Sequence, residues 1–468
     1  MKKQREHWGS QLGFIMAAAG SAVGLGLLWM FPYVTGKNGG GLFVLLYFAF
    51  VLLVAVPLFI AELVIGRRSQ KGAVCTFIDL HKEGTSWKII GWLGAGAAFL
   101  IMSYYSVVAG WGLNYVFMSL NQFWEGRTPA EIANVFTVLE QSGDINIFWH
   151  FVFTLITALL VYQGVRKGIE HWSRIMTTGL LVLLVALVGY CVTLDGFYEA
   201  LSFIFTPDLS KFKPSGALDA LGMSLLTLSL GQGIMITYGS YMKNQDNLPK
   251  VASVVGSMVI LIAVMASTMI FTIMFTFAEP GTGAEVIKHS GPGLVFKNLP
   301  IIFAKLESGS LIISTAFFVM LVFTALTSAM PLIEVVTTNF VDLYGWSRKK
   351  TVILVSTASF IFGIPSALSG SKGIFANWEA IYGISFFETI NSLATTWMLS
   401  IGAFLFSIFV GWVIDKKMLY EGFIAGTNAK WLFKPWFFLI RWVIPVATLM
   451  VILYKGELIN FDKLYLYF

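Results

Sequence analysis

The chain alternates between long apolar runs and short segments rich in polar and charged residues. Eleven of these runs approach the length of about 20 residues that an α-helix needs to cross the hydrocarbon core of a bilayer. The pattern predicts an all-α polytopic membrane protein. The expected spans cover residues 11–35, 41–66, 88–120, 147–163, 172–193, 216–242, 250–278, 309–342, 350–368, 384–414 and 432–455.

Two of the expected spans are interrupted near their middle. The first contains residues 20–41, which read GSAVGLGLLWMFPYVTGKNGGG, and the sixth contains residues 227–241, which read TLSLGQGIMITYGSY. Glycine and proline loosen a helix, and inside a bilayer the freed backbone groups are tolerated only where they face protein or a cavity. The first stretch, taken alone, is equally compatible with a kinked structural helix.

The two interrupted spans are five apart, which predicts two five-helix repeats of opposite topology around a transport site. We expect a single transporter domain over residues 1–468. Residues 11–193 would hold helices 1–5, residues 216–414 helices 6–10, and residues 432–455 helix 11. The half-helix N-termini at the breaks suit a carboxylate, and the freed carbonyls suit a desolvated alkali cation.

Composition and charge support the membrane class. Of the 468 residues, 57% are hydrophobic and 12% are charged, which is too apolar for a soluble globular protein. Lys and Arg cluster in alternate loops, and such loops are cytoplasmic, so we expect a cell-membrane protein with a cytoplasmic N-terminus and an extracellular C-terminus. On the outer side, residues 279–308 carry an apolar piece too short to span, expected to form a re-entrant or surface helix. The basic clusters lie at residues 2–5, 67–71, 166–174, 348–350 and 416–417.

Soluble-type chemistry is not indicated by any motif. The sequence contains no His/Cys metal cluster, nucleotide-phosphate loop or nucleophile elbow, so we expect neither an enzyme nor a nucleic-acid partner. Cys75 and Cys191 fall near opposite membrane faces in the expected topology, so we expect no disulfide.

Motifs along nearly the whole chain resemble the neurotransmitter:sodium symporter family. They are REHW at residues 5–8, GSAVGLG, FPY and NGGG in the first span, SYYSVVAGW at residues 103–111, residues 227–241, GPGLVF at 291–296, ALTSA at 325–329 and GWSRKK at 345–350. The resemblance implies a prokaryotic member with a leucine-transporter-like inverted-repeat fold. It also implies a small amino acid bound halfway across the membrane, beside two sodium sites.

The second sodium site of this family combines carbonyls of span 1 with oxygens of span 8. Oxygen ligands suit a hard cation such as Na+. Alternatively, the hydroxyls of Thr327 and Ser328 bond back to the preceding helical turn. Pro331 cannot donate to the carbonyl of Thr327, which leaves an extra acceptor there. The matching residues are Gly20, Val23, Thr324, Thr327 and Ser328.

The first sodium site is expected to be absent. The family places a side-chain amide in span 1 and an amide or carboxylate in span 7, where this chain has Leu27 and Val259. The carbonyl of Ala22 and Thr227 remain, but the strongest ligands are missing. We therefore expect sodium at one site and no organic cofactor.

The two gates of the family differ in how well they match. At the outer gate, Met30 and Asn391 replace an arginine and an aspartate. Losing both charges avoids stranding one of them in a partly buried site, so we interpret this as an altered gate. The inner gate matches, and an ion pair between Arg5 and Asp342 is expected. Its residues are Arg5, Trp8, Tyr241 and Asp342.

The resemblance also implies the substrate pocket. Its aromatic lid is replaced by Leu226 and another aromatic by Gln232, which makes the pocket less aromatic and more polar; alternatively, Gln232 only caps broken-helix backbone. Glu62, deep in span 2, either bonds the unwound backbone of span 6 or carries a proton. The expected substrate-binding residues are Ala22, Leu25, Gly26, Ile101, Tyr105, Leu226, Thr227, Ser229, Gln232, Ser328 and Leu332.

Together these features predict a symporter that moves a small amino acid or analogue by alternating access, coupled to sodium. One alternative is sodium-independent or proton-coupled exchange, with the proton on Glu62. Another is a ligand sensor of the same fold that binds but does not transport.

Overall fold

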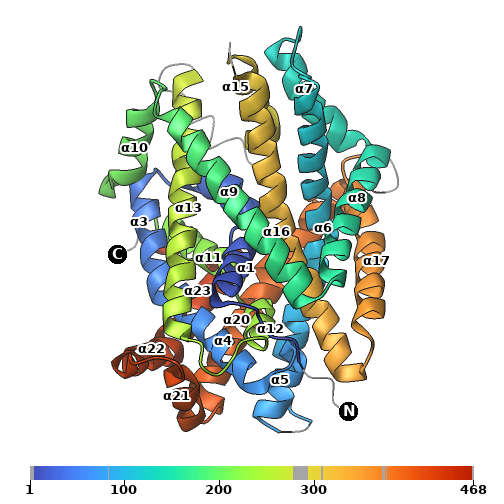
Figure 1. Ribbon diagram of the computed structural model, residues 1–468. Helices are drawn as coiled ribbons and strands as arrows, with labels where there is room; N and C mark the ends of the chain where they lie inside the picture. Colours follow the sequence, from blue (N-terminus) through green and yellow to red (C-terminus); the bar gives the residue numbers. More distant parts are fainter. Residues whose placement is uncertain are drawn as a thin grey trace.

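Figure 1 shows the computed structural model, which describes residues 5–82, 84–277, 293–306, 309–371, 375 and 377–465. These residues form helices and connecting turns without any strand, as the sequence predicts. Nine continuous helical spans among them are long and apolar enough to cross a membrane. These are Gly41–Ser69, Lys88–Leu120, Gly143–Tyr162, Val165–Cys191, Leu248–Phe277, Ser310–Tyr344, Arg348–Ala367, Phe386–Val413 and Lys430–Lys455.

The first and sixth expected spans are both broken. α1 (Gln11–Ala22) is bent by 56° from the helix Gly26–Lys37, which consists of η1 (Gly26–Met30) and α2 (Phe31–Lys37). The sixth span is divided into α11 (Pro214–Thr227) and α12 (Ile234–Gly239), with residues 228–233 not helical. The described residues therefore contain nine continuous spans and one bent pair of helices. Residues 216–242 do not form the single continuous span that the sequence predicts, because they are divided into two short helices.

Shorter helices connect the spans. They are α5 (Ala73–Leu80), α7 (Pro129–Gln141), α10 (Phe197–Phe205), α18 (Trp378–Tyr382), α21 (Lys416–Ile424) and α24 (Phe461–Tyr465).

The two breaks lie inside the bundle. In Figure 1, α1 is near the centre, behind α9 (His171–Cys191) and close to α16 (Ser310–Tyr344). α16 packs along α6 (Lys88–Leu120). Gly94 of α6 allows the second break to approach closely, because a Cβ at this position would lie 2.8 Å from the backbone of Gln232. The long helices thus enclose the non-helical segments and keep them away from lipid.

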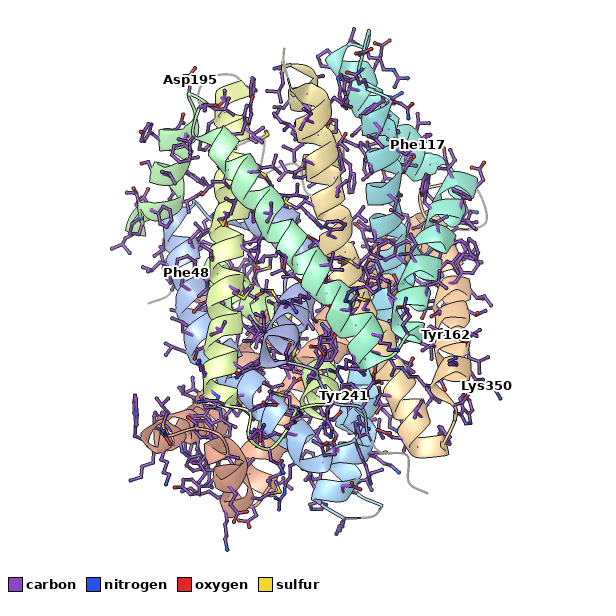
Figure 2. All side chains as sticks on the ribbon, viewed as in Figure 1. Phe48, Phe117, Tyr162, Asp195, Tyr241 and Lys350 are labelled. Atoms are coloured by element: carbon purple, nitrogen blue, oxygen red, sulfur yellow. The ribbon has the colours of Figure 1, made fainter. Side chains whose placement is uncertain are left out.

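The bundle has two distinct ends. In Figure 2, Tyr241 and Lys350 lie toward the end that carries the N-terminal segment, which we call the N-terminal end, and Asp195 and Phe117 lie toward the opposite end. The expected loop helix is present as η5 (Leu294–Asn298) and α15 (Leu299–Ala304), on the opposite end in Figure 1. It is held to α6, since the Tyr115 hydroxyl donates to the Phe296 carbonyl at 2.7 Å. Residues 278–292 and 307–308 of this loop lie outside the described residues. Both cysteine thiols are free.

Gly231 in the second break should tolerate no side chain. Its φ is +77°, and a Cβ would lie 2.8 Å from the carbonyl oxygen of Leu399. We expect Gly231→Ala to lower the free energy of unfolding by about 1–3 kcal/mol, the usual range for such backbone strain, visible as a lower Tm of the purified protein in detergent. Gly189→Ala on α9 is the matched control, because no atom lies within 4 Å of a Cβ there. Equal Tm values for the two variants would contradict this account.

Candidate substrate and cation site

The two helix breaks contact each other through a pair of serines. Ser229 Oγ donates to the carbonyl of Ser21 at 3.0 Å, and Ser21 Oγ donates to Ser229 Oγ at 3.2 Å. Both serines are buried, so these hydrogen bonds replace the water that the freed backbone would otherwise need. The breaks therefore form one polar region in the interior of the bundle.

A cavity of about 690 Å³ extends from this polar region toward the opposite end of the bundle. There its walls include Glu140 of α7 and Glu388 of α19 (Phe386–Asn391). The structure brings together every residue that the sequence predicts for the substrate. Ala22, Leu25, Gly26, Ile101, Tyr105, Leu226, Thr227, Ser229, Gln232, Ser328 and Leu332 all line the cavity.

Backbone and hydroxyl groups converge where α1 ends. The backbone N–H of Leu25 donates to the Tyr105 hydroxyl at 3.2 Å. Gly24 permits the approach of α16, because a Cβ there would lie 3.2 Å from Ser328 Oγ. The helix that restarts at Gly26 has further N–H groups without an intrahelical partner, since the first turn of any helix lacks them. This wall of the cavity can therefore donate hydrogen bonds to an anionic group.

The residues predicted for the second sodium site lie beside the first break. Ser328 Oγ lies 3.2 Å from the carbonyl oxygens of both Gly20 and Ser21. Thr327 Oγ1 donates within its own helix, to the carbonyls of Phe323 and Thr324 at 3.0 Å each. Thr327 therefore bonds back to the preceding turn of its own helix, as in the alternative interpretation. Ser328 does not, because its hydroxyl contacts carbonyls of α1. The Thr327 oxygen retains a lone pair for a cation.

Two apolar side chains occupy the positions where the family has ligands of its first sodium site. Leu27 lines the cavity, and both Leu27 and Val259 are buried. The hydroxyl of Thr227 already has two partners, the Tyr47 hydroxyl at 3.0 Å and the Ser224 carbonyl at 3.2 Å. Sequence reasoning missed Tyr47, although a tyrosine inside an apolar span needs a hydrogen-bond partner for its hydroxyl.

Met30 and Asn391, the residues predicted for an altered outer gate, both line this cavity. Lys455 is the only Lys or Arg among the described residues that line the cavity, and it ends α23 (Ile444–Lys455). Burial raises the pKa of Glu140 on another wall. Lys455 was missed in the sequence because a lysine at the end of a span resembles an ordinary interfacial anchor.

The N-terminal segment closes the N-terminal end of the bundle. Arg5 forms an ion pair with Asp342 at 2.7 Å, donates to Ser240 Oγ at 2.6 Å, and stacks over the Tyr241 ring at 4.8 Å. The Trp8 indole N–H donates to the carbonyl of Tyr238 at 3.0 Å. All four residues predicted for the inner gate therefore lie together.

A second ion pair lies behind this one and was not found from the sequence. Glu334 of α16 is fully buried and accepts two hydrogen bonds from Arg348, at 2.7 and 2.6 Å. The Tyr241 hydroxyl also donates to Glu334, at 2.6 Å. Such a bidentate pair is strong and geometrically specific. A carboxylate inside a membrane span is itself a functional signal, and applying that rule to Glu334 as well as Glu62 would have found it.

Glu62 contacts the unwound segment of the sixth span. Its side chain is buried, and Oε1 accepts a hydrogen bond from the backbone N–H of Gly231 at 2.8 Å. This contact is the one that the structural interpretation of Glu62 requires, because it satisfies a backbone group that helix geometry leaves free.

Two glutamates cap each other's helices at the N-terminal end. Glu170, in the first turns of the fifth span, accepts hydrogen bonds from the backbone N–H groups of Gly9 and Ser10 at 2.6 and 3.0 Å. Glu6 in turn accepts from the N–H groups of Val165 and Arg166 at 3.0 and 3.1 Å. Carboxylates are favourable at helix N-termini, so this exchange fixes the start of α1 against the fifth span.

Proteins that are similar to this chain in sequence are described as sodium-dependent transporters. An uncharacterized sodium-dependent transporter of Bacillus subtilis is 35% identical over 459 residues, which cover 97% of this chain and 98% of the relative. A sodium- and chloride-dependent taurine transporter of Rattus norvegicus is 25% identical over 515 residues, covering 99% of this chain and 80% of the relative.

A solved structure has the same fold. The crystal structure of MhsT in complex with L-phenylalanine superposes with a TM-score of 0.86 at 38% sequence identity, covering 96% of this chain and all of that one. The family model described as the sodium:neurotransmitter symporter family matches residues 5–131 and 121–467. The chain therefore belongs to this family of multi-pass, sodium-dependent membrane transporters.

Proposed function

We propose that the protein is a symporter that moves a small amino acid or a close analogue, coupled to sodium at one site. The observation that carries this proposal is the cavity at the two breaks, where free N–H groups and hydroxyls converge beside a set of oxygen ligands. The L-phenylalanine bound to MhsT supports an amino acid as the substrate class.

The sodium ion would bind between α1 and α16. The carbonyls of Gly20, Val23 and Thr324 and the hydroxyls of Thr327 and Ser328 supply oxygen ligands, which fit a hard cation. The Ser328 hydroxyl lies between the two helices, so turning its proton away from Gly20 would free its oxygen for the ion. Binding there would hold the broken first span against the eighth.

The substrate carboxylate would bind the N–H groups at Leu25 and Gly26 and the hydroxyl of Tyr105. In this proposal no sodium ion lies next to that carboxylate, because Leu27 and Val259 cannot coordinate one. The carboxylate then relies on the positive end of the restarted helix. Gln232 would give the pocket a polar group toward the substrate side chain.

The cavity reaches the opposite end of the bundle while the Arg5–Asp342 and Glu334–Arg348 pairs close the N-terminal end. Since Lys and Arg cluster in the loops of the N-terminal end, we propose that this end is cytoplasmic and that this conformation faces outward. Release of sodium would free α1 from α16 and allow the gate pairs to separate. A gate needs only a modest bias between two states to control the cycle.

A thermal-shift screen tests the function directly. We expect one or a few amino acids or amino-acid analogues to raise the Tm in sodium but not in choline, since a ligand at 100 times its Kd stabilises the folded state by about 2.7 kcal/mol. Thr327→Val should abolish this sodium dependence, because it removes a ligand oxygen at nearly constant volume. Thr337→Val is the control, on the same helix and with a hydroxyl that has no partner.

Other outcomes of the screen distinguish the alternatives. Equal shifts in choline would favour exchange or proton coupling over sodium symport. A sodium-dependent shift without uptake of that ligand into proteoliposomes would indicate a sensor that binds but does not transport.

The missing sodium site should be restorable. In Leu27→Asn combined with Val259→Asn, two amide oxygens join the Ala22 carbonyl and Thr227. We expect the Hill coefficient for sodium, measured from substrate binding against sodium concentration, to rise from about 1 toward about 2, the number of sites then present. Leu27→Ala with Val259→Ala opens similar space without ligands and should stay near 1. An unchanged coefficient in the asparagine variant would contradict the assignment of Leu27 and Val259 to this site.

Cys75 should report opening of the N-terminal gate. It lies on α5, which Asp342 holds through the backbone N–H of Gly72 at 2.6 Å, and burial raises the pKa of its thiol to about 11. In a Cys191→Ser background we expect slow maleimide labelling in sodium and at least several-fold faster labelling after Arg5→Gln, because the lost ion pair opens the gate.

Lys71→Gln is the matched control for this experiment. Lys71 also lowers the pKa of the Cys75 thiol, as Arg5 does, but it pairs with Asp79 at 2.7 Å outside the gate. Losing either cation therefore makes the thiol slightly less reactive, and only gate opening can accelerate labelling. Equal labelling rates in the two variants would exclude a gating role for Arg5.

A further inference from the structure

A groove lined by cations lies between α21 and the start of the eleventh span. It has a volume of about 700 Å³ and lies between α21, η8 (Lys430–Leu432), α22 (Phe433–Phe438) and η9 (Leu439–Val443). In Figure 1, α21 and α22 are at the N-terminal end of the bundle. Five cationic and five aromatic side chains line it, and no carboxylate does. We call it the basic groove; its cations are Lys416, Lys417, Lys430, Lys434 and Arg441.

These five cations have no ion-pair partner in the parts of the chain that the structure describes. None of them forms an ion pair there, whereas Arg5, Lys37, Lys71, Lys211 and Arg348 each do. The nearest carboxylate in sequence, Asp415, caps its own helix through the N–H of Lys417 at 3.0 Å. Nε of Arg441 is buried without a hydrogen-bond partner. Like charges held together without an anion repel each other, so the arrangement fits an anionic ligand that supplies acceptors.

Aromatic rings stack on two of the cations, and exposed tryptophans indicate where the groove lies relative to the membrane surface. The Arg441 guanidinium stacks on Trp412 at 4.4 Å, and Lys416 lies over Phe437 at 5.2 Å. Trp412, Trp431 and Trp442 are 48%, 74% and 51% exposed. Tryptophans with exposed rings are typical of the boundary between headgroups and acyl chains. Along α23 the exposed surface continues as Val446 and Leu449, which suits hydrocarbon.

We propose that the basic groove binds the headgroup of an anionic phospholipid, with phosphate oxygens between Lys434 and Arg441 and acyl chains along α23. Basic pockets between helices on the cytoplasmic side recognise such headgroups. Five cations exceed the charge of one phosphate, so a lipid with two phosphates should bind more tightly than a lipid with one. The site does not depend on the substrate or on sodium coupling.

The helices that form the basic groove also contact α4 (Val56–Ser69), the helix that carries Glu62. Arg67 of α4 is buried and donates to the carbonyl of Gly422 on α21, and to the carbonyl of Asp246 at 2.7 Å. Trp436 of α22 donates to the carbonyl of Pro57, also on α4, at 2.9 Å. Glu62 of α4 accepts a hydrogen bond from the second break. A lipid that contacts both α21 and α22 would therefore also stabilise the position of α4.

Native mass spectrometry of the purified full-length protein tests the proposal. Titration with cardiolipin, phosphatidylglycerol and phosphatidylcholine should give tightest binding for cardiolipin and weakest for phosphatidylcholine. For Lys434→Gln with Arg441→Gln, the cardiolipin concentration at half-saturation should rise at least tenfold. Lys243→Gln with Lys250→Gln removes two exposed lysines outside the groove and should bind as the wild type does.

Further arms separate the alternatives. Inorganic phosphate that raises the Tm as much as cardiolipin, at similar concentration, would indicate a phosphate site and overturn the lipid proposal. So would cardiolipin binding that the groove variant leaves unchanged. Should Lys434→Gln with Arg441→Gln fail to fold, Lys416→Gln with Lys417→Gln removes two charges from exposed positions and should raise the half-saturation concentration in the same direction.

Discussion

The structure depends on one constraint, that backbone N–H and C=O groups inside a bilayer must find partners within the protein. Both broken spans depart from helix geometry in the membrane interior, and several of the exposed backbone groups are hydrogen-bonded to a side chain from another helix. Glu62 accepts from Gly231, Ser229 donates to Ser21, and Ser328 lies between the carbonyls of Gly20 and Ser21. Helices distant in sequence must therefore assemble before either break is stable.

The same contacts support the binding site that we propose at the breaks. A hydroxyl that bridges two carbonyls can turn to coordinate a cation, and an N–H that donates to Tyr105 can donate to a carboxylate instead. A bound ligand would then take the place of hydrogen-bond partners that the protein itself supplies when the site is empty. These polar groups would therefore have partners both with and without the ligand. Apolar residues at Leu27 and Val259 offer no such exchange, so in our proposal the cation ligands lie on the side of the break that faces α16.

Charge is distributed differently at the two ends. At the N-terminal end, Arg5–Asp342 and Arg348–Glu334 join the N-terminal segment and the helix Arg348–Ala367 to α16, and Glu6 and Glu170 cap one another's helices. At the opposite end the cavity is lined by the uncharged Met30 and Asn391, and it remains connected to that surface. No ion pair between these two positions can hold the walls of the cavity together. The basic groove adds a third, unpaired group of charges at the edge of the N-terminal end.

The sequence by itself determined the features that depend on local physics. Apolar run lengths predicted the spans, glycines predicted that the first and sixth spans are interrupted, and the family motifs selected eleven residues that all line one cavity. It did not determine pairings between distant residues, because a single buried Glu334 or Tyr47 has many possible partners until helices pack. Only the tertiary structure joined Glu334 to Arg348 and Tyr47 to Thr227, brought Lys455 to the cavity wall, and assembled five cations from residues 416 to 441 around one groove. Helix formation follows short-range periodicity, whereas these contacts follow from which faces pack together.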